Sequence, residues 1–457
     1  MSTEISPYLT DASGFSGWAD KVLVPADEQQ VVEILKNAVA TSTPVTVVGA
    51  GYGLTGGRVA QGGWVISLEK FRRLEIHNGF ARAGAAMSLL ELRDAARPSG
   101  QFYAPDPTEI NSSVGGTIAT NASGSRSFRY GSTRRHLNAV RVALMDGRVV
   151  AYRRGDAIDF PVPPLPIPNV TKYTAGYPLR PGMDWIDLFC GSEGTLGVVL
   201  EAELSLLPIP DDLFTAIIFF ASDDDAINAV EAWRPTPRLQ MLEYVDRKAL
   251  DMIRGRFPDI PRQAEAALLI ESQGEADVDD WEQRLQAASA LIDGSWFAVS
   301  AQDRERFRRF RHTLPEVVID TVRRRGFKQI GTDYAVPLHR NRDILKVYHE
   351  RLDAADIGLY MCFGHIGDAH VHINVLPETA QQAETASALL MDLAKEVVAM
   401  GGTVSAEHGL GKQKAHLLSL QYTPEHIEAM MAVKRRMDPQ WLLGRGTLFP
   451  YPTTTTA

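Results

Sequence analysis

Apolar residues recur at helical spacing in some segments of the chain and at strand spacing in others. Between Asp27 and Val39 they return every three or four positions, which predicts an amphipathic helix. The β-branched run at 44–48 predicts a strand, and residues 64–144 alternate short strand-like runs with turns and one helical run at 89–96. This mixture of helices and strands predicts an α+β fold.

A proline-rich stretch interrupts this pattern. Prolines crowd residues 153–185, which predicts an irregular surface excursion and a candidate rim for an active site. A buried strand is expected at 195–207, where Pro208 and Pro210 end it. We therefore expect a domain boundary at this point, with one domain at residues 1–210 and a second at residues 211–457.

The second half again alternates strands and helices. The expected strands are 215–220, 267–271 and 370–376, and the expected helices are 223–233, 278–291, 380–400 and 424–437. A loop rich in glycine, glutamate and histidine lies between the last two helices.

Composition removes several classes of function. Of 457 residues, 45% are hydrophobic and 23% charged, and no apolar run approaches the roughly 20 residues that a bilayer requires. The formal net charge is −9 with scattered basic residues, which argues against general nucleic-acid binding. Cys190 and Cys362 cannot supply the four thiolates of an ordinary iron–sulfur cluster. With no apolar leader after Met1, we expect a reducing, cytoplasmic location, with peripheral membrane association left open.

The first candidate for chemistry is the loop at residues 49–57, which has five glycines in nine positions. Backbone amides in such a turn can point inward and bind an anion without side-chain charge, so the loop is a candidate pyrophosphate site. It matches neither the G-x-G-x-x-G fingerprint that opens a helix nor a phosphate loop that ends in Gly-Lys-Ser/Thr. Taken alone, a tight turn is an equally good interpretation.

Two later segments favour a cofactor. Residues 105–124 and 191–198 are both rich in glycine, serine and threonine. Small side chains there would let a large flat molecule lie against the backbone.

The richest chemistry lies at residues 363–376. If 370–376 is a strand, a period of two puts His370, His372 and Asn374 on one face. His365 precedes them in a glycine turn that can fold back toward that row.

A carboxylate and an imidazole stand side by side at Glu407 and His408, among small residues. Two imidazoles plus one carboxylate can hold a divalent metal such as Zn or Mn and leave positions open for substrate. The competing interpretation is a set of hydrogen-bonded cleft residues, which the convergence with a cofactor loop disfavours.

The small-residue segments, with Arg129-Tyr130-Gly131 between them, resemble the FAD-binding domain of the vanillyl-alcohol oxidase and p-cresol methylhydroxylase type flavoproteins over about residues 11–210. The resemblance implies a two-subdomain FAD-binding domain, followed by an α+β substrate domain with an antiparallel sheet and a C-terminal helical segment. It implies cofactor contacts at Gly49, Ala50, Gly51, Tyr52, Gly53, Leu54, Thr55, Pro105, Ser113, Gly116, Thr117, Asn121, Gly124, Gly194, Gly197 and Val198. Some relatives attach FAD covalently through a histidine in the first loop, which is absent here, so noncovalent FAD is expected.

The Gly-His-x-Gly-Asp and Glu-His-Gly segments resemble the D-lactate, glycolate and D-2-hydroxyglutarate dehydrogenase branch of this superfamily. By position, the resemblance implies that the metal ligands are His365, His372 and Glu407, that the base is His408, and that substrate contacts are Arg311 and Asn374. The branch has Gly-Asn where this chain has Ala369-His370. We count His370 as a candidate substrate contact, with competition for the metal and simple space filling as alternatives.

Two further departures bear on the substrate and on the end of the chain. Gly331 stands where hydroxyglutarate enzymes carry a lysine, two residues before Asp333, so a second distal carboxylate on the substrate is less expected. Gly444-Arg445 replaces the Asn-Pro pair of the closing motif.

The resemblance as a whole implies FAD-dependent oxidation of a small D-2-hydroxy acid of the D-lactate or glycolate type. Hydride would pass to flavin N5 with help from a divalent metal and a histidine base. The implied electron acceptor is a quinone, a cytochrome or an electron-transfer flavoprotein rather than NAD. Alternatives are an FAD-containing ether-lipid (alkylglycerone-phosphate) synthase, an FAD subunit of a multi-subunit glycolate oxidase and a metal-dependent hydrolase. The sequence leaves open whether the protein forms a homodimer.

Overall fold

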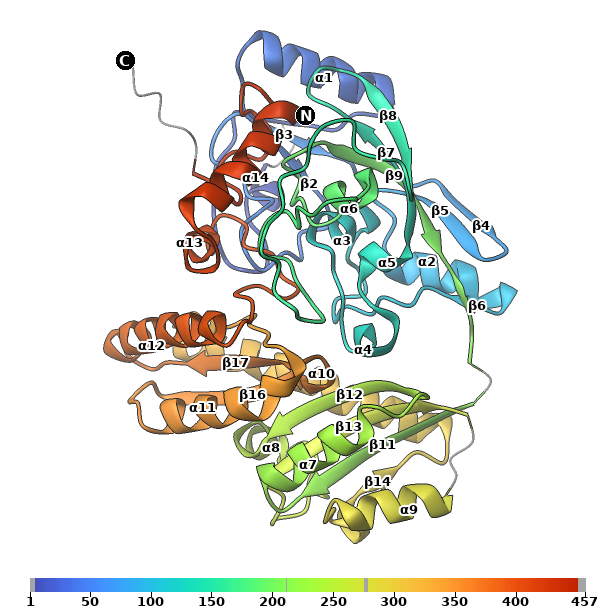
Figure 1. The fold of residues 1–457 in the computed structure, drawn as a ribbon, viewed down its shortest axis with the longest axis vertical. Helices are drawn as coiled ribbons and strands as arrows, with labels where there is room; N and C mark the ends of the chain where they lie inside the picture. Colours follow the sequence, from blue (N-terminus) through green and yellow to red (C-terminus); the bar gives the residue numbers. More distant parts are fainter. Residues whose placement is uncertain (1–4, 211, 275–277, 451–457) are drawn as a thin grey trace.

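Four β-sheets organise the part of the chain that this computed structural model describes, residues 5–210, 212–274 and 278–450. Three sheets belong to the N-terminal part and the largest belongs to residues beyond Leu213, so that two parts stack along the long axis (Figure 1). The expected α+β class, with an antiparallel sheet in the second half, is confirmed.

The N-terminal part combines a small parallel sheet with a larger antiparallel one. The parallel sheet has the order β1 (Lys21–Leu23), β3 (Trp64–Ser67), β2 (Val45–Val48). The antiparallel sheet has the order β4 (Leu74–His77), β5 (Phe80–Gly84), β9 (Val198–Ser205), β7 (Leu137–Ala143), β8 (Val149–Arg153). A two-stranded pair joins β6 (Gln101–Phe102) to β10 (Leu207–Pro208).

Helices of this part form where caps and apolar spacing agree. α1 (Glu28–Ala40) begins at Asp27, whose side chain accepts from the Gln30 amide, and it buries Val31, Leu35 and Ala38. The others are α2 (Leu89–Ala96), α3 (Val114–Thr120), α4 (Ser127–Tyr130), α5 (Thr133–His136) and α6 (Trp185–Phe189). The sequence pattern predicts α1 and α2 but not α3. The sequence of α3 is rich in Gly, Thr and Ala, so its apolar residues show little helical periodicity. Capping by Ser113 and packing against its neighbours stabilise this helix.

The C-terminal part is built on one seven-stranded antiparallel sheet. Its order is β14 (Trp296–Phe297), β11 (Leu213–Phe220), β13 (Ala266–Gln273), β12 (Leu239–Asp246), β16 (Leu359–His365), β17 (His370–Leu376), β15 (Ile330–Gly331). Its helices are α7 (Asp223–Trp233), α8 (Arg247–Ile253), α9 (Val278–Ala287), α10 (Ala301–Arg325), α11 (Asn341–Asp353) and α12 (Ala380–Ala399).

Both faces of this sheet are covered, since apolar residues point both ways along the central strands. On β11, Ile217 and Phe219 share a buried cluster with α8 and α10, whereas Ile218 and Phe220 share one with α7 and α9. On β17 the apolar side chains join the second of these clusters. The opposite side of β17 carries His370, His372 and Asn374, and only its last residue, Leu376, joins the cluster of α8 and α10.

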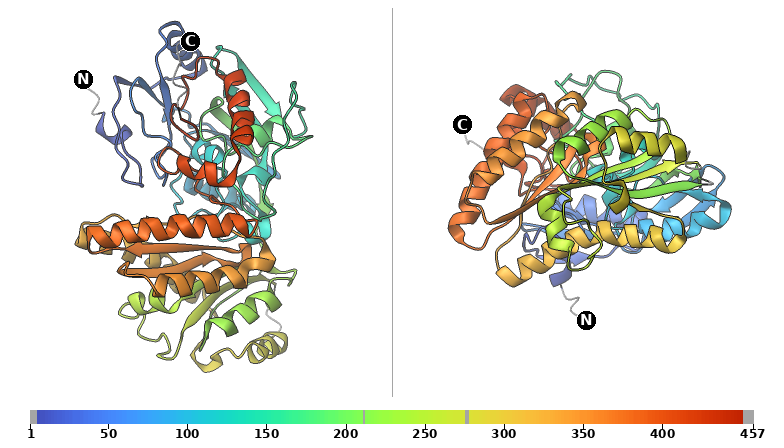
Figure 2. Two further views of the ribbon diagram at one scale, coloured as in Figure 1. Left: turned by 60° about the vertical axis from the view of Figure 1, so that its left-hand side comes forward. Right: turned by 90° about the horizontal axis from the view of Figure 1, so that it is seen from below.

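After α12 the chain returns to the N-terminal part, where α13 (Leu418–Gln421) and α14 (Pro424–Met437) lie against it (Figure 2). The amide of Val45 donates to Leu442 O over 2.8 Å, and the amide of Gly444 donates to Val45 O over 2.8 Å. Lys434 on α14 is buried, and its Nζ donates to Asp438 Oδ2 at 2.6 Å and to Thr195 O at 2.7 Å. The last described residues therefore complete the N-terminal part.

We expect Lys434→Met to lower the free energy of unfolding by about 3 to 5 kcal/mol, because it leaves the buried Asp438 carboxylate without its cation. Urea unfolding followed by tryptophan fluorescence measures the change. The exposed Lys395, paired with Asp392 on α12, is the matched control, and its methionine variant should change stability by less than about 1 kcal/mol. Equal stabilities of the two variants would contradict a structural role for the Lys434 ion pair.

Candidate active site at the junction of the two parts

The glycine loop after β2 contains backbone amides that have no hydrogen-bond acceptor among the described residues. Within the described part of the chain, no group accepts a hydrogen bond from the amides of residues 51–55, whereas Ala50 donates to Ser113 Oγ at 3.4 Å and Gly56 to Asp11 Oδ2 at 2.9 Å. Gly51 has φ 97°, a conformation that glycine adopts without strain. Consecutive amides without an acceptor fit an anionic group such as a pyrophosphate.

The other two expected cofactor segments pack around this loop. Ser113 caps α3 and accepts from the Gly116 amide at 3.3 Å, while Gly191 and Glu193 donate to carbonyls of the same helix. Thr117 is buried in α3, and Asn121 ends this helix in the left-handed region with φ 51°. Pro105 is buried, and its carbonyl oxygen accepts a hydrogen bond from Arg93. Gly194 has open space where a Cβ would stand. Gly197 and Val198 are packed in the core, Gly197 against Val142 and Phe189.

Gly124 lies where the backbone of the second segment comes closest to itself. It has φ 133°, and a Cβ there would stand 1.9 Å from Asp106 O. We expect Gly124→Ala to lower the free energy of unfolding by about 1 to 3 kcal/mol and to leave little bound flavin, because the chain at 105–107 must move. Gly155→Ala is the control, since Gly155 has φ 93° but open space around its Cβ position. Flavin retained by Gly124→Ala at the level of the control would count against this segment as a cofactor contact.

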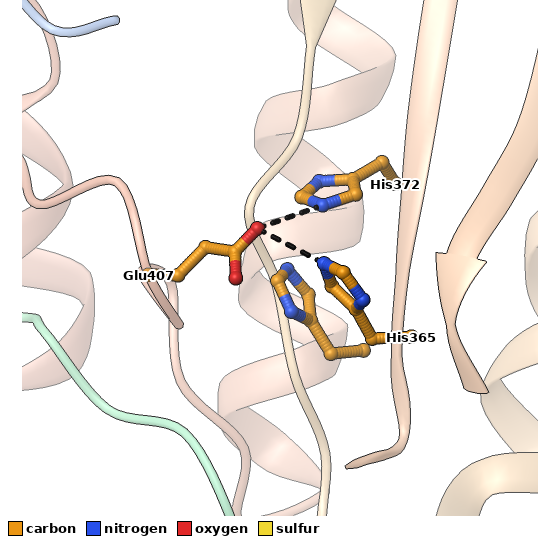
Figure 3. A group of neighbouring side chains, drawn as sticks. His365, His372 and Glu407 are labelled. Carbon is orange, nitrogen blue, oxygen red and sulfur yellow. Dashed lines mark hydrogen bonds and ion pairs between the residues drawn. The ribbon is translucent and has the colours of Figure 1, made fainter. Parts of the chain in front are cut away.

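The three expected metal ligands lie next to one another (Figure 3). His365 ends β16 and His372 lies on β17, as the predicted strand period requires, and Glu407 comes from the loop after α12. Glu407 Oε1 lies 3.2 Å from His365 Nε2 and 3.3 Å from His372 Nε2.

Each imidazole is oriented by a partner at its other nitrogen. His365 Nδ1 lies 2.6 Å from Glu243 Oε1 on β12, and His372 Nδ1 lies 3.0 Å from Thr332 O. Burial alone would lower the pKa of His365, but the adjacent Glu243 carboxylate raises it to about 8. Burial opposes ionisation of Glu243 too, yet His365 and Arg311 bring its pKa to about 2. Both Nε2 atoms thus face the shared carboxylate, and such outer partners are typical of histidine metal ligands.

The second oxygen of Glu407 is held by the N-terminal part. Lys172 Nζ donates to Glu407 Oε2 at 3.0 Å, and Ser123 Oγ donates to the same oxygen at 2.7 Å. Burial alone would raise the pKa of Glu407, but Lys172 and His365 hold it well below its usual range. Glu407 Oε1 is therefore the atom that remains for a cation.

Asp333 fixes the loop that carries Glu407 and His408. Its buried carboxylate accepts from the backbone amides of Ala406 and Glu407, each at 3.1 Å, and of His408 at 2.8 Å. Burial opposes ionisation of Asp333, but the neighbouring imidazoles of His408 and His370 keep its pKa well below the usual range. A charged carboxylate that accepts hydrogen bonds from several backbone amides holds this loop in one conformation.

His408 is the most accessible imidazole of the group. Its side chain is 24% exposed and its Nδ1 lies 3.5 Å from Asp333 Oδ1. Its ring stacks on that of His372, with centroids 5.2 Å apart. Burial lowers its pKa below the usual value of 6.5, so the ring is neutral at physiological pH. A neutral imidazole beside a carboxylate has the character of a general base.

The expected substrate contacts differ in how many of their polar atoms already have hydrogen-bond partners in the protein. Arg311 on α10 donates from Nε to Glu243 Oε2 at 3.0 Å and from Nη1 to Thr108 Oγ1 at 3.3 Å. Asn374 Oδ1 accepts from Gln329, while its buried Nδ2 has no hydrogen-bond partner among the described residues. His370 is fully buried, and burial together with the adjacent His372 lowers its pKa to about 3.

Several residues of the site are not evident in the sequence pattern. Lys172 belongs to the proline-rich excursion, and Ser123, Glu243 and Thr332 lie on three further segments far apart in the chain. The signal that could have found Lys172 is that it is the single lysine in a stretch already expected to rim the site. Glu243, between the apolar Leu242 and Tyr244 on β12, could have been a second signal, since a buried charge needs a partner.

A buried glutamate joins the region of the glycine loop to the loop that carries Glu407. Glu193 accepts from the amides of Leu410 at 2.9 Å and Gly411 at 2.8 Å, and burial raises its pKa to about 7. The amide of Lys412 donates to Thr55 O over 3.0 Å. The cofactor loop and the Glu407 loop are therefore direct neighbours.

Comparison with known proteins agrees with this geometry. Residues 209–448 match the family described as FAD linked oxidases, C-terminal domain, and residues 19–153 match the FAD binding domain. The chain belongs to the FAD-linked oxidase family. It is a flavoprotein oxidoreductase of the superfamily that the sequence motifs resemble, and its cofactor is FAD.

Relatives of the FAD-linked oxidase family span almost the whole chain. The D-lactate dehydrogenase of Archaeoglobus fulgidus is 30% identical over 93% of this chain and 90% of its own length. A glycolate oxidase subunit GlcD from Bacillus subtilis is 27% identical over 97% and 92%, and a D-2-hydroxyglutarate dehydrogenase from Xanthomonas citri pv. viticola is 28% identical over 94% and 89%. An alkyldihydroxyacetonephosphate synthase structure shares the fold, with a TM-score of 0.65 at 16% identity over 93% of this chain and 76% of that one. No described helix of this FAD-linked oxidase is long and apolar enough to cross a membrane.

Proposed function

We propose that this FAD-linked oxidase oxidises a small D-2-hydroxy acid to the 2-oxo acid, with a divalent metal and His408 as partners of the flavin. The observation that carries the proposal is the meeting of His365, His372 and Glu407 beside the loop that bears His408. Relatives named for D-lactate, glycolate and D-2-hydroxyglutarate support the substrate class.

The donor set suits such a cation. Two imidazoles and one carboxylate are the protein ligands of many divalent metal sites that keep a position open for substrate. Here each imidazole also has a hydrogen-bond acceptor at its other nitrogen. When bound, FAD supplies the hydride acceptor and the cation supplies a Lewis acid for the substrate oxygens. Lys172 keeps Glu407 charged and turned toward the imidazoles.

The chain itself contributes the proton acceptor and the substrate seat. His408 takes the proton of the substrate hydroxyl, and Asp333 beside its Nδ1 stabilises the imidazolium that results. Asn374 Nδ2 is the free donor for a substrate oxygen, and Arg311 offers its guanidinium to the carboxylate. Gly331 carries no side chain for a second distal carboxylate, which favours D-lactate or glycolate.

The absorption spectrum of the purified protein tests the proposal when it is followed anaerobically during addition of D-lactate, glycolate and D-2-hydroxyglutarate. We expect an oxidised-flavin band that bleaches with D-lactate or glycolate and survives L-lactate. A flavin that stays oxidised with every acid would overturn the reaction class while the family assignment stands.

A second candidate role is that of an FAD subunit within a larger glycolate oxidase. The relatives named glycolate oxidase subunit GlcD favour it. Dye reduction by the isolated chain distinguishes the two roles, because a subunit that depends on partners reduces its flavin with substrate yet passes electrons on poorly. Electron acceptors such as a quinone, a cytochrome or an electron-transfer flavoprotein can be compared in the same assay.

A further inference from the structure

The ring of His370 is buried without a hydrogen-bond partner. Its side chain is 0% exposed, and among the described residues neither Nδ1 nor Nε2 makes a hydrogen bond. Buried polar atoms almost always find a partner, because an unsatisfied one carries its full desolvation penalty. Because Asp333 Oδ1 lies 3.1 Å from Nε2, Nδ1 is the nitrogen that is open to a ligand that the polypeptide does not supply.

The surroundings of the ring suggest which ligand this is. Donor atoms of His365, His370, His372 and Glu407 all lie within 4.8 Å of one another. The centroid of the His370 ring lies 4.3 Å from that of His372 and 5.3 Å from that of His365. We propose that His370 is a fourth protein ligand of the divalent cation, which this chain would hold with three imidazoles and one carboxylate. The proposal rests on the proposed function, which assigns the other three residues to the same cation.

Asp333 gives His370 the outer partner that a ligand histidine needs. His370 Nε2 lies 3.1 Å from Asp333 Oδ1, close enough for a hydrogen bond but out of alignment for one. Asp333 itself is held in place by backbone amides of the Glu407 loop. Coordination through one nitrogen and donation to a carboxylate from the other is the usual arrangement of a metal-bound histidine.

Burial argues against direct contact between His370 and the substrate. His408 and His372 keep 24% and 14% of their side chains exposed, whereas His370 keeps none. A substrate that arrives from solvent meets those two rings first. Four protein donors would leave two positions on a six-coordinate cation such as Mn²⁺, the number that the carboxylate and hydroxyl of a 2-hydroxy acid occupy.

X-ray absorption at the manganese edge tests the proposal on the chelator-stripped holoenzyme reloaded with Mn²⁺. We expect three imidazoles around the ion in the wild-type protein and two in His370→Asn. The Kd for Mn²⁺, measured by competition with a chelating dye, should rise about 10-fold or more in His370→Asn. His339→Asn replaces an exposed histidine outside the group and should leave Kd unchanged. His372→Ala should weaken binding at least as much as His370→Asn.

Two results would overturn the assignment. Two imidazoles in the wild-type protein, with a Kd for His370→Asn within twofold of wild type, would remove His370 from the ligand set while the proposed three-ligand site stands. Absence of Mn²⁺ and Zn²⁺ binding by the wild-type protein would remove the proposed metal as well. Because the imidazole count is made on the wild-type protein, it decides the question even if His370→Asn folds poorly.

Discussion

His408→Ala is expected to slow anaerobic flavin reduction by a 2-hydroxy acid about 10²- to 10⁴-fold while the protein keeps its yellow colour. The imidazole stacks on His372 and stands beside Asp333 at the accessible side of the group, and burial lowers its pKa, which favours the neutral ring. In the proposed reaction, the hydroxyl proton would then have no acceptor. Stopped-flow absorbance at the flavin band measures the rate, and equilibrium flavin content measures the colour.

His416→Asn is the matched control, because His416 is exposed and outside the site. It should reduce its flavin at the wild-type rate. The pH profile gives an independent check: burial lowers the pKa of His408, so the base is neutral above pH 6.5 and the wild-type rate should be constant from pH 7 to 8, then fall in acid below its pKa. Wild-type single-turnover kinetics in His408→Ala would remove the residue from the mechanism.

Glu407→Gln should lose the metal and also destabilise the protein. The amide cannot provide the charge that both imidazoles and the buried Lys172 face. Removing one partner of a buried ion pair costs about 3 to 5 kcal/mol, and we expect a fall of this order in the free energy of unfolding of the metal-free protein. Metal content by plasma mass spectrometry and urea unfolding measure the two effects.

A double variant separates these effects. Lys172→Met combined with Glu407→Gln removes both charges of the pair, and the contact of Lys172 with Asp368 at 3.6 Å is lost in addition, so stability should recover part of the loss while metal stays absent. A Glu407→Gln protein that retains metal at wild-type affinity would refute the ligand assignment. A double variant as unstable as the single one would show that the pair does not explain the loss of stability.

The sequence pattern predicted the elements that carry the histidines, because a strand period of two is a local property. The row of His370, His372 and Asn374 forms on β17 as expected, and α2 has the predicted bounds. Glu407 and His408 were found because they are adjacent and surrounded by small residues.

The partners that orient these residues could not be predicted in the same way. Glu243, Thr332 and Lys172 reach the site through strand order and interdomain packing, which no local pattern records. Antiparallel pairing of β12 with β16 brings Glu243 beside His365, 122 positions away in sequence. Short helices such as α3 were also not predicted, since their sequences lack apolar periodicity.

The return of the chain after α12 has a consequence for biosynthesis. Val45 on β2 pairs with residues 442–444, and Lys412 and Glu193 tie the Glu407 loop to the glycine loop. The ribosome makes the returning segment hundreds of residues after β2, so the N-terminal part emerges with its edge strand β2 unpaired on one side and its cofactor loop uncovered. We therefore expect stable uptake of flavin only after the returning segment has been made. A chain that ends early would lack both these contacts to the glycine loop and Glu407, and we expect it to bind flavin poorly.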